Sequence, residues 1–280
     1  MKKKTSRVFI CIFFLVGLSL LLYPSAANQW NNYRQKQLIS HYENTLEVME
    51  PADFDREWEK AKSYNNALRE QEKELLGKLY RQVMNTDGAG MMGNLSIPAI
   101  HMKLSIYHGT GDEVLRMGIG HLEGTALPIG GAGTHAVLAA HRGLPSAKLF
   151  TDIDQLQEGD AFYIHLLDEV LAYKVDRILP MVEKDDYKTL DEALKADEGK
   201  DYVTLFTCTP YGVNSHRLLV RGSRVPYNGE EDAAASVFDS VLGAVRVHYI
   251  RYLLLGLAVT IVAIFIIKFL FKKKESRGKQ

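Results

Sequence analysis

Residues 201–221 constrain the fold most, because their pattern is that of a strand, a turn and a second strand. Residues 202–207 are mainly β-branched and aromatic, a loop with Pro, Gly and Asn follows, and apolar residues resume at 216–220. Cys208 follows the first predicted strand and Arg217 lies at the start of the second. A hairpin here would therefore bring a thiol and a permanent cation to the same end of a sheet.

Short strands are also predicted between Gly93 and this hairpin. Seven or eight strands at close spacing favour a small barrel or sandwich. Longer helices are expected before the barrel, in the polar region 28–85, where apolar residues approximate a helical spacing. The other predicted strands are 95–100, 104–107, 134–140, 161–166 and 170–179, and the predicted helices are 30–48, 53–83, 112–117, 147–150 and 190–196.

The formal net charge of zero hides an uneven distribution. Residues 1–27 carry four basic residues and no acidic one, and residues 251–280 carry seven basic residues and one acidic one. The part between them holds 23 basic and 33 acidic residues, so the bulk of the protein is acidic. This argues against nucleic acid as a partner, because phosphate binding requires a basic face.

Both basic ends adjoin apolar runs that predict membrane segments. Residues 8–23 suit a signal sequence or a signal anchor, and the small residues at 25–27 would permit cleavage. Residues 253–271, at ~1.5 Å per residue, would cover most of a ~30 Å hydrocarbon core. The positive-inside rule then places both basic ends in the cytoplasm and residues 28–250 outside.

The chain has only two cysteines, and they lie in different environments. Cys11 is inside the first apolar run, whereas Cys208 is alone in the outer domain, which therefore has no internal disulfide. A lone thiol in an oxidising compartment is a liability unless it is buried or used. A buried structural cysteine remains open on this evidence, but the loop position and Arg217 favour a reactive one.

A cysteine nucleophile needs a proton handler, which is most often histidine. His141 is favoured, because it ends an apolar strand at a glycine turn. His135 is expected to be structural, and His216 is expected to face away from Arg217, because adjacent strand residues point to opposite faces. The sequence alone does not choose cleanly among the eight outer histidines, which are His41, His101, His108, His121, His135, His141, His165 and His216.

Other chemistries lack their motifs. The sequence has no His-Glu-x-x-His or paired-cysteine pattern for zinc, so neither a metal nor a cofactor is expected. The glycine-rich stretch 118–133 lacks the Gly-Lys-Ser/Thr of a phosphate loop, and no Gly-x-Ser-x-Gly elbow is present.

Three segments resemble a known family. Residues 204–208 resemble the Thr-Leu-x-Thr-Cys signature of sortases, and Arg217 matches the arginine of that family. His141 matches its histidine, within Ala-Ala-His-Arg-Gly-Leu-Pro-Ser-Ala-Lys-Leu-Phe. The longer segments 141–156 and 208–222 are similar to class C sortases, the pilin polymerases of Gram-positive bacteria. The likeness is strong over residues 93–227, and the two membrane segments fit it too.

The resemblance implies a mainly β fold, an eight-stranded sortase-type barrel with N-terminal helices. It also implies a transpeptidase. Cys208 would attack the Thr–Gly carbonyl of an LPXTG-like sorting signal, His141 would act as acid and base, and Arg217 would stabilise the oxyanion. A lysine amine of the next pilin would resolve the thioester. The implied partners are pilin subunits and the membrane, while the oligomeric state remains unknown.

Two other functions stay open. A housekeeping-type sortase would anchor surface proteins to peptidoglycan instead, and the nucleophile it accepts would distinguish it. A membrane-tethered surface domain with an inert Cys208 would not react with thiol reagents.

One departure from the resemblance concerns a lid. Many class C enzymes carry an Asp-Pro-aromatic motif just before the barrel, and residues 67–93 contain none. A degenerate or absent lid is therefore expected. The expected organisation is a signal sequence or anchor (1–27), a helical region and linker (28–92), the barrel (93–227), a linker (228–252), a transmembrane helix (253–271) and a basic cytoplasmic tail (272–280).

Overall fold

The structure is a computed structural model that describes residues 2–86 and 88–231. The predicted second membrane segment, most of the linker before it and the basic tail lie outside these residues. Residues 1–228 form one compact unit, which contains all the described helices and strands.

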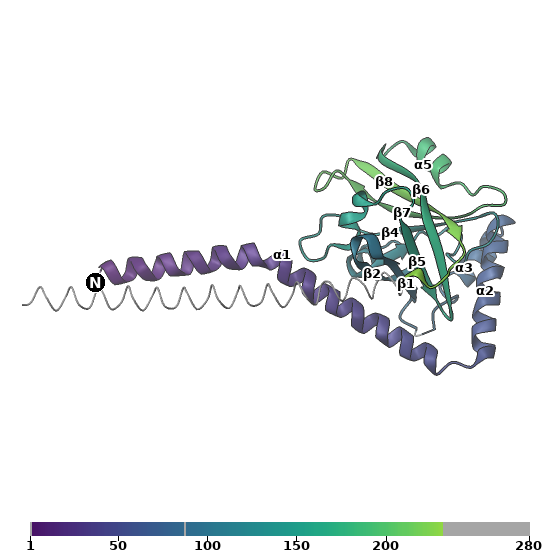
Figure 1. The fold of residues 1–280 in the computed structure, drawn as a ribbon, viewed down its shortest axis with the longest axis horizontal. Coiled ribbons are helices and arrows are strands. Elements are labelled where there is room, and N and C mark those ends of the chain that lie inside the picture. Colours follow the sequence, from purple (N-terminus) through teal and green to yellow (C-terminus); the bar gives the residue numbers. More distant parts are fainter. Residues whose placement is uncertain (1, 87, 232–280) are drawn as a thin grey trace, which may run out of the picture. The chain divides into compact units, whose positions relative to one another are not determined.

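Eight strands close into a barrel, as the sequence predicts (Figure 1). Their spatial order is β1-β2-β3-β4-β7-β8-β6-β5. The pairs β2–β3 and β4–β7 are parallel, and the other neighbours are antiparallel. The strands are β1 (Met91–Ile97), β2 (Met102–His108), β3 (Ile119–His121), β4 (Thr134–Ala139), β5 (Ala161–Leu166), β6 (Glu169–Glu183), β7 (Asp201–Thr209) and β8 (His216–Val225).

The pairing directions define two ends of the barrel. β4 and β7 run in parallel and finish together, and β8 begins beside the end of β7. β3 runs antiparallel to β4 and parallel to β2, and β1 runs antiparallel to β2. The start of β3, the start of β2 and the end of β1 therefore lie at this same end. This end is called the Cys208 end below. The opposite end holds the start of β1 and the end of β2.

The helices differ from the expected ones in their boundaries. The first apolar run and the expected helix 30–48 form one continuous helix, α1 (Lys2–Glu47). The expected helix 53–83 is divided into α2 (Pro51–Arg69) and α3 (Lys73–Leu79), because Gln71 takes a left-handed φ of 60° that ends α2. α4 (Asp112–Met117) has the expected bounds, and α5 is Tyr187–Leu194. Short 3₁₀ helices occupy η1 (Pro98–Ile100) and η2 (Leu149–Gln155).

Two of the differences have local causes. The expected strand 95–100 stops at Ile97, because Pro98 begins a 3₁₀ turn and has no N–H for a ladder. The strand β3 was not expected, because it is only three residues long and lies in the glycine-rich stretch 118–133. Its short length hides the two-residue alternation on which a strand prediction depends.

The core fills the barrel and extends to the N-terminal helices. Phe162 and Tyr173 are fully buried and stack with ring centroids 5.5 Å apart. Tyr64 of α2 and Tyr80 after α3 belong to the same buried cluster as the strand residues. The helices before the barrel therefore bury their apolar side against it, which is how helices without a core of their own become stable.

α1 is also docked to the barrel through polar contacts. The Tyr42 hydroxyl donates to the Met92 carbonyl at 2.9 Å and accepts from the Leu167 N–H at 3.0 Å. α1 is the one helix among the described residues that is long and apolar enough to cross a membrane.

Candidate active site

The β7–β8 hairpin places Cys208 opposite an arginine. Cys208 and Arg217 are direct cross-strand partners. Such partners project from the same face with Cβ atoms about 4.5–5.5 Å apart. The thiol is free and partly exposed, whereas its neighbours Thr207 and Thr209 are buried. The hairpin therefore presents a thiol and a guanidinium together at the surface.

His141 lies at the same end of the barrel. Ala139 of β4 pairs with Phe206 of the parallel strand β7, so His141 and Cys208 each follow this pair by two residues. The Ala140 N–H donates to the Phe206 carbonyl at 3.2 Å, and the Thr207 hydroxyl donates to the Ala140 carbonyl at 2.7 Å. These bonds continue the pairing beyond the end of β4. They place His141 beside the strand that carries Cys208.

The turn between β7 and β8 fixes the guanidinium of Arg217. Nη1 donates to the carbonyl of Asn214 at 3.2 Å and to that of His216 at 3.0 Å. His216 is the cross-strand partner of Thr209, and its Nδ1 lies 2.8 Å from the Ser215 hydroxyl. The loop carbonyls thus hold the Arg217 guanidinium in place. The His216 ring forms a hydrogen bond with Ser215.

A second arginine in the site, Arg142, was missed by the sequence analysis. Its side chain is only 9% exposed. Nη1 donates to the Thr209 hydroxyl at 3.0 Å, and Nη2 pairs with the Asp154 carboxylate. Arg142 therefore connects the segment after His141 to the residue after Cys208. The only sequence signal was its position beside His141.

Tyr211 forms part of the same surface. A Cβ atom at Gly143, whose φ is +81°, would lie 3.2 Å from the Tyr211 ring. Only a glycine fits this left-handed turn comfortably under the ring. Tyr211 and Val213 are 57% and 69% exposed, so the β7–β8 loop presents apolar side chains next to the thiol.

Three other histidines, His108, His121 and His135, form hydrogen bonds within the fold. His135 contacts the Lys195 carbonyl at 2.9 Å and the Thr204 hydroxyl at 2.7 Å, as a structural histidine would. His121 is fully buried, and burial lowers its pKa to about 4. Burial also lowers the pKa of His108 and of His135. His121 is therefore neutral at pH 7.

The segment between α3 and β1 packs at the end opposite Cys208. The Tyr80 hydroxyl donates to the His121 carbonyl at 2.9 Å and accepts from the Gly109 N–H at 2.9 Å. The His108 ring contacts the carbonyls of Val83 and Gly90 at 2.8 and 3.0 Å. His108 ends β2, so these contacts hold residues 80–90 near the far end of the barrel.

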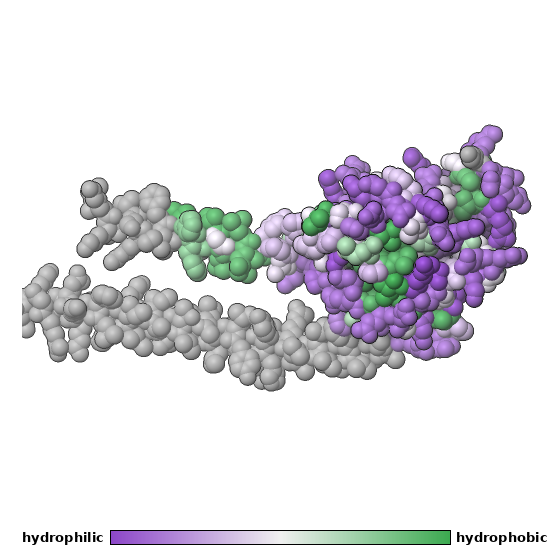
Figure 2. Space-filling model, turned by 90° about the horizontal axis from the view of Figure 1, so that it is seen from above, coloured by the Kyte–Doolittle hydropathy of each residue, from purple (hydrophilic) through white to green (hydrophobic). Residues whose placement is uncertain are grey.

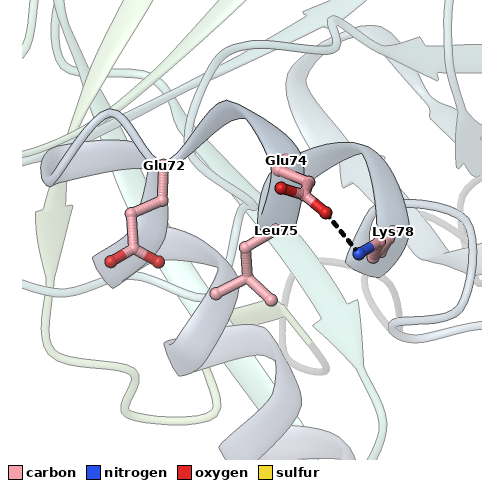
Figure 3. A pocket seen from close by; sticks show the side chains of 4 residues that line it. All are labelled: Glu72, Glu74, Leu75 and Lys78. Carbon is pink, nitrogen blue, oxygen red and sulfur yellow. Dashed lines mark hydrogen bonds and ion pairs between the residues drawn. The ribbon is translucent and has the colours of Figure 1, made fainter.

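A surface hollow outside this site lies on α3. It is lined by Glu72, Glu74, Leu75 and Lys78, with an ion pair of 2.7 Å between Glu74 and Lys78 (Figure 3). It offers no nucleophile. Among residues 2–86 and 88–231, no group of three or more His, Cys, Asp or Glu is arranged to hold a metal ion.

Comparisons with known proteins agree with this geometry. A family model described as "Sortase domain" matches residues 95–225. The crystal structure of sortase C1 from Streptococcus agalactiae is 43% identical, with a TM-score of 0.63 over 69% of this chain and 100% of that chain. A Clostridium perfringens sortase C with the C-terminal cell wall sorting motif is 42% identical, with a TM-score of 0.59 over 68% of this chain and 99% of that one.

A curated relative, sortase A from Bacillus anthracis, is 29% identical over 50% of this chain and 62% of its own length. The chain thus matches less than two thirds of the first curated relatives. Against solved sortase C structures, by contrast, the match reaches their full length at about 40% identity. Together with the closed eight-stranded barrel, this shows that the chain belongs to the sortase family.

Proposed function

We propose that this protein is a cysteine transpeptidase whose reacting groups are Cys208, His141 and Arg217. The observation that carries the proposal is the cross-strand pairing of Cys208 with Arg217 at the barrel end where His141 follows β4. A thiolate is the nucleophilic form of cysteine, and a fixed guanidinium beside it favours the negative charge that develops during acyl transfer.

In the proposed reaction, the Cys208 thiolate attacks the carbonyl carbon of the Thr–Gly bond in a sorting signal. The oxyanion of the tetrahedral intermediate is stabilised by Arg217. As the C–N bond breaks, His141 donates a proton to the leaving amine, and a thioester remains on Cys208. An incoming amine then attacks the thioester and gives a proton to His141, and the thiolate leaves. One amide bond is broken and one is formed.

The incoming amine is proposed to be a lysine of the next pilin, so that the product is a covalent pilus. The support is the likeness to sortase C structures, one of them with a C-terminal sorting motif. Anchoring to peptidoglycan is the alternative, and the likeness to sortase A keeps it in view. Parallel reactions with a pilin lysine and a wall-peptide amine distinguish the two functions by which product forms.

The site is proposed to be open, without a functional lid over Cys208. The thiol is partly exposed, and residues 80–90 bond to His108 and His121 away from it. The barrel domain is proposed to be 93–227, preceded by the helical region 28–92. It is proposed to lie outside the cell, anchored by residues 1–27, while 253–271 cross the membrane and 272–280 remain cytoplasmic.

The test uses the full-length protein in detergent micelles and a peptide containing Leu-Pro-x-Thr-Gly, with hydroxylamine as the incoming amine. Wild type is expected to release the segment after threonine and to form the hydroxamate. Cys208→Ala is expected to form neither product while keeping the wild-type melting temperature. His216→Ala is the matched control and is expected to stay within about threefold of wild type. Hydroxamate formation by Cys208→Ala would refute the proposal.

A further inference from the structure

α1 runs along the barrel in a defined direction. Tyr42 bonds to Met92, near the start of β1, which is at the end opposite Cys208. Seven residues earlier in the helix, the buried Gln35 accepts from the Ser105 N–H of β2 at 2.9 Å and donates to the Met117 carbonyl. Going back along α1 toward its N-terminus therefore leads along the barrel toward the Cys208 end.

The last contact in this direction lies at the Cys208 end itself. The Asn28 side-chain oxygen accepts from the backbone N–H of Lys148 at 3.0 Å. Lys148 belongs to the segment 141–148 that follows β4 and begins with His141. α1 therefore leaves the barrel next to the proposed active site. Figure 1 shows its N-terminal part continuing away from the barrel.

The apolar part of α1 begins where these contacts end. A helix needs about 20 residues to cross a ~30 Å hydrocarbon core, and a span that starts at Val8 then ends at Ala27. Asn28 is the next residue and would then lie at the boundary between hydrocarbon and headgroups. Figure 2 shows the same change along α1, from an apolar part outside the barrel to a more polar part that reaches it.

Two aromatic side chains mark the same level. Trp30 and Tyr33 are 65% and 54% exposed, and their ring centroids are 5.9 Å apart. They lie about one and two helical turns beyond Ala27, and their side chains are not packed into the hydrophobic core. Exposed tryptophan and tyrosine just outside a membrane span are characteristic of the bilayer interface, where the ring is apolar and its N–H or O–H reaches water.

From these contacts we propose that the Cys208 end of the barrel faces the bilayer, and that segment 141–148 lies in its phospholipid headgroup layer. The occupant of this surface is the lipid of the membrane that α1 spans. Pro145 and Ser146 are exposed, the Lys148 side chain is 64% exposed, and its ammonium is paired with the Asp152 carboxylate at 3.0 Å. The segment is therefore polar and suits the headgroup layer rather than the hydrocarbon. The proposed active site thus opens at the membrane surface rather than toward bulk solvent. This inference requires that α1 is retained as an anchor, and it does not depend on the proposed catalysis.

The two tryptophans of the chain allow a direct test. Full-length protein is reconstituted in vesicles of phosphatidylcholine and phosphatidylglycerol, with or without bromine near the top of the acyl chains. In Trp58→Phe, the remaining Trp30 is expected to lose about half of its emission to the brominated lipid. In the matched variant Trp30→Phe, the remaining Trp58, which bonds to Asp168 on the barrel, is expected to be unaffected. Equal quenching of both tryptophans, or of neither, would overturn the proposal.

A second measurement places the segment itself. A nitroxide on Ser146→Cys, in full-length protein with Cys11→Ala and Cys208→Ala, is expected to show a membrane depth at the phosphate level by power saturation with oxygen and a nickel chelate. The same label on Glu192→Cys, in the exposed face of α5, is expected to behave as fully aqueous. Identical accessibility at both sites would contradict a membrane-facing Cys208 end.

A third measurement tests the hydrogen bond between Asn28 and Lys148. Adding Asn28→Ala to the labelled protein is expected to sharpen the nitroxide spectrum at position 146, because the segment loses its tether to α1. Asn32→Ala, an exposed asparagine of the same helix, is expected to leave the spectrum unchanged. The intact mass of the membrane-bound protein is expected to include residues 1–27, and a mature N-terminus at Asn28 would overturn the inference.

Discussion

At the scale of single residues, Arg142 is the feature that best explains how the proposed site keeps its shape. A buried guanidinium is costly unless its charge and its donors are satisfied. Here Asp154 neutralises the charge and the Thr209 hydroxyl accepts a second bond, whereas Nε is buried without a hydrogen-bond partner among the described residues. Because Thr209 follows Cys208 and Arg142 follows His141, one side chain fixes the spacing between two loops that carry reacting groups.

Arg142 is therefore predicted to act as a positioning residue. Arg142→Lys keeps a positive charge that can pair with Asp154, but an ammonium cannot bond to Asp154 and to the Thr209 hydroxyl with the planar geometry of a guanidinium. We therefore expect kcat for peptide cleavage to fall ~10–100-fold with little change in KM. Steady-state kinetics with the peptide substrate measure this. Arg116→Lys, on the exposed face of α4, is the control and should match wild type. A rise in KM at unchanged kcat would mean that Arg142 binds substrate instead.

At the scale of elements, closure of the barrel depends on close approaches between strands that only glycine allows. β1 pairs with β5 to close the sheet, and a Cβ atom at Gly93 would lie 2.1 Å from the His165 carbonyl oxygen. A backbone atom cannot move aside as a flexible side chain could. The first strand of the barrel therefore carries a glycine where it meets its partner most closely.

Gly93→Ala is predicted to lower the free energy of unfolding by ~2–3 kcal/mol, because the strands must separate to admit the methyl group. Gly77→Ala is predicted to change the free energy of unfolding in the opposite direction. Gly77 is in α3 with no atom within 4 Å of its Cβ position, so alanine should raise the free energy of unfolding by ~0.5–1 kcal/mol. Urea unfolding of both variants checks the pair. Equal effects would show that the β1–β5 approach is not tight in solution.

At the scale of the whole molecule, stability is predicted to decrease in acid, because the described part of the chain contains histidines that must stay neutral. His121 is completely buried beneath Tyr80, and its pKa falls to about 4 from the usual 6.5. The unfolded chain binds a proton near pH 6.5, whereas the folded chain does so only near pH 4. The free energy of unfolding therefore falls between these values as pH decreases, and below pH 4 this loss is complete.

The contribution of His121 is about 3 kcal/mol when complete. It is measured by urea unfolding at several pH values between 7 and 4. His121→Gln should lose less stability over this window than wild type, since glutamine does not titrate. His41→Gln, an exposed position on α1, should follow the wild-type curve. Parallel curves for wild type and His121→Gln would contradict a buried neutral His121.

The sequence by itself determined the architecture and the family. Alternating strands, turn residues and the spacing of Cys208 and Arg217 are local patterns, and they predict a hairpin within a small barrel or sandwich without knowledge of distant contacts. The choice of the eight-stranded barrel came from the likeness to sortases. The bounds of α4 and β5 were predicted correctly for the same reason. The choice of His141, in contrast, depended on the likeness to sortases, because strand periodicity does not say which strands are neighbours.

Only the tertiary structure decided what lies around the thiol. The parallel pairing of β4 with β7 brings the segment after His141 to Cys208, across more than sixty residues of chain. The burial of Arg142 and the tether between Asn28 and Lys148 join residues that are distant in sequence. Such contacts leave no periodic signal, because each is a single pairing fixed by the path of the whole chain. The direction in which the site faces was for that reason visible only once α1 was seen against the barrel.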